Sequence, residues 1–117
     1  MHAGYLFKQS AWIKDWRRRY FRLFMSAAGP RLYFSADADA PPHGMVDLKG
    51  CLTVKSADEK SGKKFSFEVA TGDAVFFLYA PTEAEKDEWV GQIGRAIVLG
   101  SRSFVAGAGD EEEEDDE

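Results

Sequence analysis

Short runs of aromatic and aliphatic residues alternate with polar turn residues along most of this chain. Seven runs are rich in the aromatic and β-branched side chains that favour strands, at residues 4–8, 16–25, 31–35, 44–48, 51–55, 64–70 and 74–80. Turn-forming pairs such as Gly29-Pro30, Pro41-Pro42 and Gly72-Asp73 separate them. Because the connections are short, the pattern predicts antiparallel hairpins rather than crossover units.

The spacing of apolar residues changes after the last of these runs. Thr82 is a good helix N-cap, and Glu85 completes a capping box. An apolar stripe at helical spacing follows, made of Trp89, Val90, Ile93, Ala96 and Ile97. Gly100 is expected to end the helix. The pattern therefore predicts one amphipathic helix of roughly four turns.

Seven short strands followed by one helix indicate a mainly β fold with one α-helix. We expect a seven-stranded, bent antiparallel β-barrel capped by the C-terminal helix, because open edges and an unfilled barrel end both expose apolar surface. A chain of 117 residues suits a single domain. We place that domain at residues 1–100, and a linker with a disordered acidic tail at residues 101–117.

Acidic residues are concentrated at the C-terminal end. The formal net charge is −5, but residues 110–117 contribute eight acids and no base. The rest of the chain holds 12 acidic and 15 basic residues, a net charge of +3. The tail either increases solubility, or it folds back on a basic surface and competes with the ligand of that surface.

Composition narrows the class of protein. No apolar run approaches the length of a transmembrane helix, and residues 1–4 lack the basic start and apolar run of a secretory signal. Cys51 is the single cysteine. An intramolecular disulfide is therefore impossible, and a reducing, cytosolic setting is expected.

A basic segment between residues 8 and 22 holds six basic residues and one acid. Side chains alternate along a strand, so Arg17 and Arg19 share a face with the apolar Phe21, Leu23 and Met25. Unpaired charges are not buried in a core. We therefore expect the three apolar side chains inside the barrel and both arginines at its rim.

Lys8 gives the same result on the preceding strand. It shares a face with Leu6 and would lie opposite Arg17 in a hairpin joined by residues 9–15. Cations that converge on one rim repel each other, and a bound polyanion relieves that repulsion. The alternative is a solvated edge strand whose cations discourage aggregation, but it does not explain why these three cations share the inward register.

The loop between these strands carries Trp12 and Ile13 next to Lys14. Trp favours the headgroup level of a bilayer, and Lys is attracted to anionic lipid. We therefore expect Trp12 and Ile13 to contact a membrane. Alternatively, one of these apolar side chains folds back onto the sheet.

An ordered series of motifs carries a family resemblance. It consists of GYLFK at 4–8, WRRRYFRL at 16–23, LYF at 32–34, GMVDL at 44–48 and EKDEW at 85–89. In this order the motifs resemble a pleckstrin homology (PH) domain over residues 3–99. CLTVK at 51–55, IGRAIV at 93–98 and SRS at 101–103 also resemble plant and green-algal proteins that consist of little more than one PH domain.

The resemblance implies the fold that the pattern predicts, and it implies a ligand. Lipid-binding members grip an inositol phosphate with a lysine late in the first strand and an R/K-x-R pair early in the second. Those positions are Lys8, Arg17 and Arg19 here. Lys14 and Arg18 would lie at the periphery of the site.

Two departures from the family pattern bear on the headgroup. His43 stands where members that prefer 3-phosphorylated polyphosphoinositides often have a stronger base, and histidine is mostly neutral at pH 7. Leu32 stands near a position where such members often have a tyrosine. The resemblance therefore favours a headgroup with few phosphates, such as phosphatidylinositol 3-phosphate, with His43 as a weak partner.

We expect a non-catalytic phosphoinositide-binding module that targets the protein to membranes. The protein would be cytoplasmic, peripheral on the endosomal or plasma membrane, monomeric and without a cofactor. The alternative is a PH-fold adaptor that binds a protein partner and has weak or no lipid affinity.

Enzyme, metal and nucleic-acid functions are not expected. The two histidines, His2 and His43, lack metal-ligand spacing. Cys51 lies in a predicted strand, where a buried structural thiol is expected rather than a nucleophile. The basic patch is compact, and the acidic tail would repel a long polyanion.

Overall fold

The computed structural model describes residues 2–10, 14–51 and 53–109, with side chains up to residue 100. Within these ranges the strands are β1 (His2–Gln9), β2 (Trp16–Ser26), β3 (Gly29–Ser35), β4 (Gly44–Asp47), β5 (Thr53–Ser56), β6 (Ser66–Ala70) and β7 (Val75–Tyr79). The helices are α1 (Asp58–Ser61) and α2 (Glu83–Gly109). Every strand expected from the sequence is confirmed.

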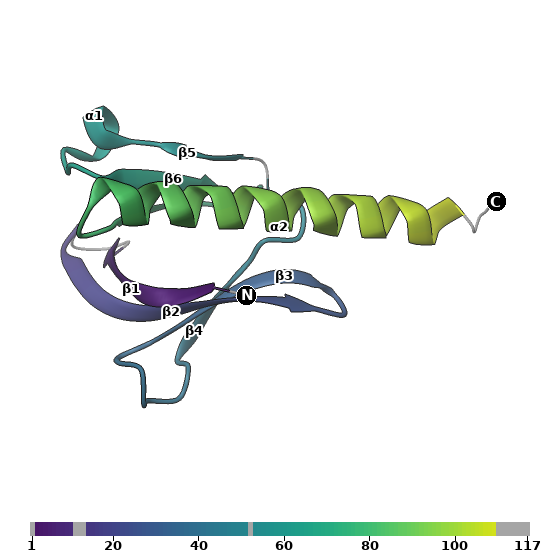
Figure 1. The fold of residues 1–117 in the computed structure, drawn as a ribbon, viewed down its shortest axis with the longest axis horizontal. Helices are drawn as coiled ribbons and strands as arrows, with labels where there is room; N and C mark the ends of the chain where they lie inside the picture. Colours follow the sequence, from purple (N-terminus) through teal and green to yellow (C-terminus); the bar gives the residue numbers. More distant parts are fainter. Residues whose placement is uncertain (1, 11–13, 52, 110–117) are drawn as a thin grey trace.

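The seven strands form one antiparallel sheet in the order β4-β3-β2-β1-β7-β6-β5. Its ends curl toward each other into two layers, and α2 lies along the opening between them (Figure 1). β4 and β5 are the edge strands. The result is the bent, barrel-like β-sandwich with a C-terminal helix that the pattern predicted.

The register of β1 and β2 places their apolar side chains in the core. Leu6, Phe21 and Leu23 are buried, and Met25 packs against the same core. The inward face expected for residues 21, 23 and 25 is therefore confirmed. A sheet with this one face covered has its register fixed, since a slip of one residue would turn every side chain over.

α2 closes the core from one side. Its inward-facing residues Trp89, Ile93 and Ala96 are buried in the core. The helix begins as expected, because the Glu85 amide donates to the Thr82 hydroxyl oxygen at 3.2 Å. The Thr82 hydroxyl in turn donates to the Glu85 carboxylate at 3.3 Å.

The expected end of the helix at Gly100 is wrong. α2 continues to Gly109 and extends past the turn between β2 and β3 (Figure 1). Gly100 serves close packing instead, since a Cβ atom there would lie 2.7 Å from Pro30 Cδ. The backbone of residues 101–109 is helical, where a linker was expected. The division into a domain ending at residue 100 and a following tail stays a prediction.

The short helix α1 was not expected from the sequence. The Asp58 carboxylate accepts hydrogen bonds from the amides of Phe65 at 3.2 Å and Ser66 at 3.0 Å. It also accepts one from the Lys86 ammonium of α2 at 3.1 Å. The Lys86 bond, helped by the two amides, lowers the pKa of Asp58. One carboxylate thus joins α1, β6 and α2.

A glycine in β4 makes room for an aromatic ring in β3. Phe34 and Gly44 are directly paired across the two strands. A Cβ atom at Gly44 would lie well inside van der Waals contact of the Phe34 ring. The ring therefore covers the glycine backbone, and it packs against Phe21 with 5.5 Å between centroids.

Within residues 2–10, 14–51 and 53–109, neither helix combines the length and the apolar character needed to cross a bilayer.

We predict that Asp58→Asn removes part of the acid sensitivity of the fold. A carboxylate with a lowered folded-state pKa stabilises above its unfolded value, about 3.9, and this stability is lost as pH falls through the folded-state value. The variant should lose about 1 kcal/mol at pH 7, a low value because the carboxylate is half exposed. Its free energy of unfolding should also change less between pH 5 and pH 2, as measured by urea denaturation. Asp73→Asn, in an exposed turn, is the control, and equal acid dependence of wild type and Asp58→Asn would contradict the assignment.

We predict that Gly44→Ala destabilises the protein by about 1–3 kcal/mol, the usual cost of overpacking. The added methyl group must displace the Phe34 ring, which Phe21 holds in place. Thermal unfolding measures the effect. Gly72→Ala is the matched control, because nothing lies within 4 Å of a Cβ atom at Gly72. Similar melting temperatures for the two variants would show that the ring moves without cost.

Candidate functional site

The pairing of β1 with β2 brings three cations to one end of the sheet. Lys8 lies directly opposite Arg17, and Leu6 lies opposite Arg19. Directly paired residues share a face, and so do residues two apart on a strand. Lys8, Arg17 and Arg19 therefore lie on the face that Leu6 and Phe21 occupy in the core, as the sequence predicted. We call these three cations the rim cluster.

Two aromatic rings lie near the Lys8 ammonium group. Its Nζ atom lies 5.3 Å from the centroid of Phe34 and 5.6 Å from that of Phe76, within the range of a cation–π attraction. Both rings pack against the hydrophobic core. Burial, and secondly the charge of Arg19, lower the pKa of Lys8. The ammonium group is thus held where its positive charge is costly and a nearby anion would be favourable.

The two arginines of the rim cluster have different partners. Arg17 Nε donates to the Asp15 carboxylate at 3.1 Å, but both side chains are more than half exposed. Such an exposed pair is weak and exchanges readily for another anion. Arg19 donates from Nη1 to the backbone oxygen of Arg18 at 2.8 Å. Among the ion pairs of the described residues, none joins Arg17 or Arg19 to a buried carboxylate.

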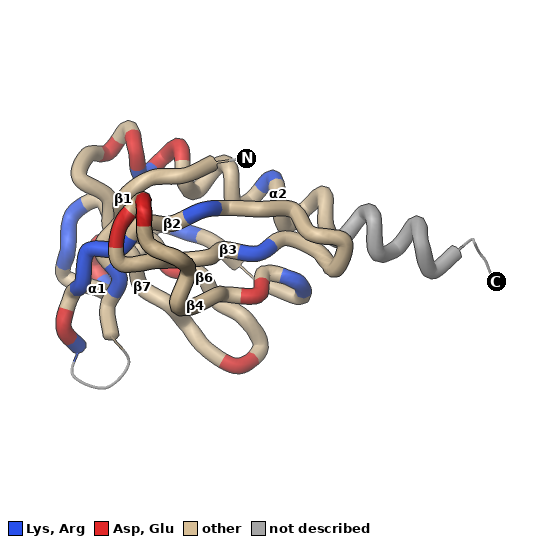
Figure 2. Tube along the Cα trace, turned by 90° about the horizontal axis from the view of Figure 1, so that it is seen from below, with Lys and Arg blue, Asp and Glu red and all other residues tan. Residues whose placement is uncertain are grey.

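Arg18 points to the other face of β2. Its guanidinium group lies 3.7 Å from the centroid of the Tyr5 ring, on the outer side of the sheet. The structure therefore separates Arg18 from the rim cluster, and its role at the periphery of the site stays a prediction. Figure 2 shows Lys and Arg segments concentrated at the end of the molecule that holds the β1–β2 loop.

The β1–β2 loop is closed at its base by Ser10 and Asp15. The Ser10 amide donates to the Asp15 carbonyl at 2.7 Å, and Lys14 has a positive φ of 57°. Lys14 is exposed beside this turn. Trp12 and Ile13, the expected membrane contacts, lie outside the described residues.

His43 is connected to the rim cluster indirectly, by the ring of Phe34. Its imidazole packs edge to face on Phe34, with 5.3 Å between centroids, and its amide donates to the Phe34 carbonyl at 3.0 Å. Phe34 thus contacts both Lys8 and His43. Sequence reasoning missed the roles of Phe34 and Phe76. The inward register of Phe34 could be read from the strand alternation, but the convergence of β3 and β7 on Lys8 could not.

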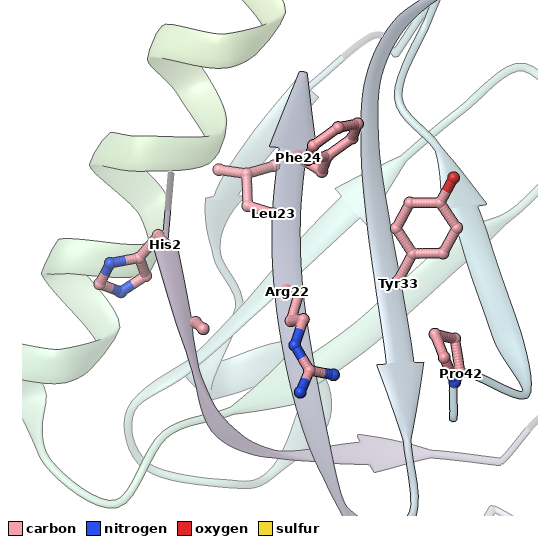
Figure 3. A pocket seen from close by; sticks show the side chains of 7 residues that line it. His2, Arg22, Leu23, Phe24, Tyr33 and Pro42 are labelled. Atoms are coloured by element: carbon pink, nitrogen blue, oxygen red, sulfur yellow. The ribbon is translucent and has the colours of Figure 1, made fainter. Parts of the chain in front are cut away.

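An open, mostly apolar groove of about 560 Å³ lies away from the rim cluster. Its lining residues are His2, Ala3, Arg22, Leu23, Phe24, Tyr33 and Pro42. Figure 3 shows Phe24 and Tyr33 projecting from the neighbouring strands β2 and β3. The groove lies at the opposite end of β2 from Arg17, so it forms a second, separate surface.

Cys51 makes structural contacts. Burial raises the pKa of its thiol, and the thiol donates to the Ala70 carbonyl at 3.2 Å. Across the described part of the chain, no three His, Cys, Asp or Glu side chains gather closely enough to hold a metal ion.

Comparisons with known proteins agree with the fold and the motif order. The model of the PH domain family matches residues 1–98. Pleckstrin homology domain-containing protein 1 of Arabidopsis thaliana is 42% identical over 108 residues, which cover 88% of this chain and 72% of the relative. Human pleckstrin is 35% identical over 105 residues, but these cover only 29% of its length.

Solved structures show the same similarity. The C-terminal PH domain of pleckstrin, crystallised in complex with D-myo-Ins(1,2,3,4,5)P5, is 34% identical and has a TM-score of 0.70. The match covers 82% of this chain and 96% of that one. The PH domain of human oxysterol binding protein-related protein 11 has a TM-score of 0.71 at 23% identity, which supports the fold. This chain belongs to the PH domain family.

Proposed function

We propose that this PH domain binds the headgroup of a phosphoinositide at the rim cluster and so brings the protein to a membrane surface. It acts as a non-catalytic module, located in the cytoplasm and peripherally on endosomal or plasma membrane. Lys8, Arg17 and Arg19 hold the phosphates. Lys14 and Arg18 meet neighbouring anionic lipid.

The observation that carries this proposal is the convergence of Lys8 with Arg17 and Arg19 on one face. Burial and the Arg19 charge lower the pKa of Lys8. An anion placed between these cations removes their mutual repulsion and raises the pKa of Lys8 again. Arginine can also bind a phosphate through two parallel N–H bonds, and lysine adds a mobile point charge.

A related PH domain supports an inositol phosphate as the class of ligand. The pleckstrin C-terminal PH domain, about a third identical to this chain, holds an inositol pentakisphosphate in its crystal structure. An inositol phosphate is therefore the ligand class to test first.

The β3–β4 side of the site contributes no Lys or Arg, which favours a headgroup with few phosphates. His43 is the one base contributed by the β3–β4 loop, residues 36–43, and that loop carries Asp37 and Asp39. Leu32 is fully buried in the core and presents no hydroxyl group. Phosphatidylinositol 3-phosphate has a headgroup of this kind, and it would direct the protein to endosomes.

The β1–β2 loop would approach the bilayer when the headgroup is bound. The rim cluster lies at the base of this loop, and Lys14 is exposed there. Trp12 and Ile13 would then contact the membrane, where an indole ring favours the headgroup level.

A protein-binding adaptor is the second candidate. The open apolar groove beside Phe24 and Tyr33 favours it, because exposed apolar surface of this kind often marks a protein contact. The two functions use different surfaces and are therefore separable by mutation.

We predict that the double variant Arg17→Ala/Arg19→Ala loses at least about tenfold in affinity for vesicles that contain phosphatidylinositol 3-phosphate, because each charged hydrogen bond contributes about 1.5–3 kcal/mol. Vesicle sedimentation measures the affinity. Binding of the wild type should also weaken as salt rises from 0.1 to 0.5 M.

The control is Lys55→Ala/Arg95→Ala, which removes the same charge from exposed positions on β5 and α2. It should bind as the wild type does. If both double variants bound equally well while folded, the rim cluster would not be the site. If the wild type ignored every phosphoinositide but captured a protein through the groove, the adaptor function would replace the lipid one.

We predict that the acidic tail does not block the rim cluster of its own chain. Lys8 pairs with Leu78, just before the start of α2, and the 27 residues of α2 span about 40 Å. The eight residues that follow reach at most about 28 Å when fully extended. Replacing every acid of residues 110–117 by its amide should therefore change the affinity for the soluble headgroup, inositol 1,3-bisphosphate, less than twofold at 0.15 M salt. Calorimetry measures this affinity, and a fivefold gain would restore the fold-back model.

A further inference from the structure

We propose that Tyr5 and Arg22 latch the β3–β4 loop to the outer face of the sheet, and that this latch keeps the carboxylates of the loop away from the rim cluster. A released loop would block the rim cluster with its carboxylates, and we call this the blocking role. This part of the proposal rests on the proposed function, since it concerns access to the same site. The latch itself is a contact between described residues and is tested without any ligand.

Both backbone polar groups of Ala38 are held by side chains from the strands. Arg22 Nη2 donates to the Ala38 carbonyl at 2.7 Å. The Ala38 amide donates to the Tyr5 hydroxyl oxygen at 3.2 Å. Tyr5 belongs to β1 and Arg22 to β2, so the middle of the loop is fastened across two strands. Figure 3 shows Arg22 extending from β2 beside the groove.

A stack of side chains fixes the two latch residues in place. Arg18 lies 3.7 Å from the centroid of Tyr5, and the Tyr5 and Tyr20 rings meet edge to face at 4.9 Å. Arg22 lies 4.7 Å from the centroid of Tyr20. All four residues point to the outer face of β1 and β2, opposite the face that carries the rim cluster. The latch therefore draws the loop away from the headgroup side.

The loop carries negative charge and no Lys or Arg. Asp37 and Asp39 are its two acids, and both are exposed. The Asp37 carboxylate accepts the Asp39 amide at 2.9 Å, and the Asp37 carbonyl accepts the Ser35 hydroxyl at 2.8 Å. No ion pair of the described residues joins either carboxylate to a cation.

Both ends of the loop lie close to Phe34, which contacts Lys8 of the rim cluster. Phe34 lies in β3, two residues before the loop begins, and its ring lies against the Lys8 ammonium. The last residue of the loop is His43, whose ring packs on the same Phe34. A loop released from Ala38 would remain tethered at these two points. Its carboxylates would then be a competing anion at high local concentration, in reach of the cations that hold the phosphate.

The first experiment measures the latch alone. Tyr5→Phe removes the hydroxyl acceptor and keeps the ring that Arg18 and Tyr20 contact. Amide hydrogen exchange of Ala38 and Asp39 should speed up at least about fivefold. Tyr20→Phe, a hydroxyl deletion in the same stack, is the matched control and should leave the exchange of these amides unchanged. Equal exchange in both variants and the wild type would overturn the latch.

The second experiment measures the blocking role. Tyr5→Phe should bind vesicles with phosphatidylinositol 3-phosphate about three- to tenfold more weakly than the wild type. Adding Asp37→Asn and Asp39→Asn to that variant should restore affinity to within twofold, because asparagine keeps the turn but removes the charge. Weak binding that persists without the carboxylates would overturn the blocking role.

The two readouts separate this inference from the proposed function. If the wild type ignores these vesicles, the lipid function fails and the blocking role fails with it. Faster exchange in Tyr5→Phe would still establish the latch as a feature of the fold.

Discussion

The antiparallel pairing of β1 with β2 is the constraint on which the fold and the site both depend. One register sets Leu6 and Phe21 in the core and places Lys8 opposite Arg17. A shift by one residue would expose the core side chains and move the cations to the outer face. Apolar burial therefore enforces the positions of the charges, and no separate interaction is needed to gather them.

Gathering three cations has an electrostatic cost that the surrounding structure reduces only in part. The rings of Phe34 and Phe76 attract the Lys8 ammonium group, yet its pKa remains lowered. Asp15 is the carboxylate paired with Arg17, and that pair is exposed. The site is thus preorganised and incompletely neutralised, which is the condition under which an anionic ligand gains most from binding. The contact of Gly44 with Phe34 supports this arrangement by fixing the ring that separates Lys8 from His43.

The fold directs two segments away from the rim cluster, namely the acidic β3–β4 loop and the helix that leads to the acidic C-terminal residues. α2 begins near Lys8 and carries the chain toward the far end of the molecule (Figure 1). Gly100 packs on Pro30 and holds the helix on the sheet along this direction. Arg22 and Tyr5 draw the acidic β3–β4 loop to the outer face. For the loop, hydrogen bonds to Ala38 rather than a salt bridge determine where the charged segment lies.

Much of this arrangement could be predicted from the sequence, because it depends on local periodicity. Alternation along 16–25 predicted which residues of β2 face inward, and the change of period after Thr82 predicted the helix and its cap. The same alternation predicted that Lys8, Arg17 and Arg19 would share a face. These features follow from the chain geometry of one strand, one hairpin or one helix, so a short window of sequence contains the information.

Contacts between distant segments were decided only by the tertiary structure. Gly100 is an example, because sequence alone cannot distinguish a glycine that stops a helix from one that lets Pro30 approach. Three other contacts join residues that are far apart along the chain. They are the Asp58–Lys86 bond, the contact of Phe76 with Lys8, and the latch that holds Ala38. Periodicity determines the direction in which a side chain points, but the partner that it meets depends on how the whole sheet curls, and that is a property of all seven strands together.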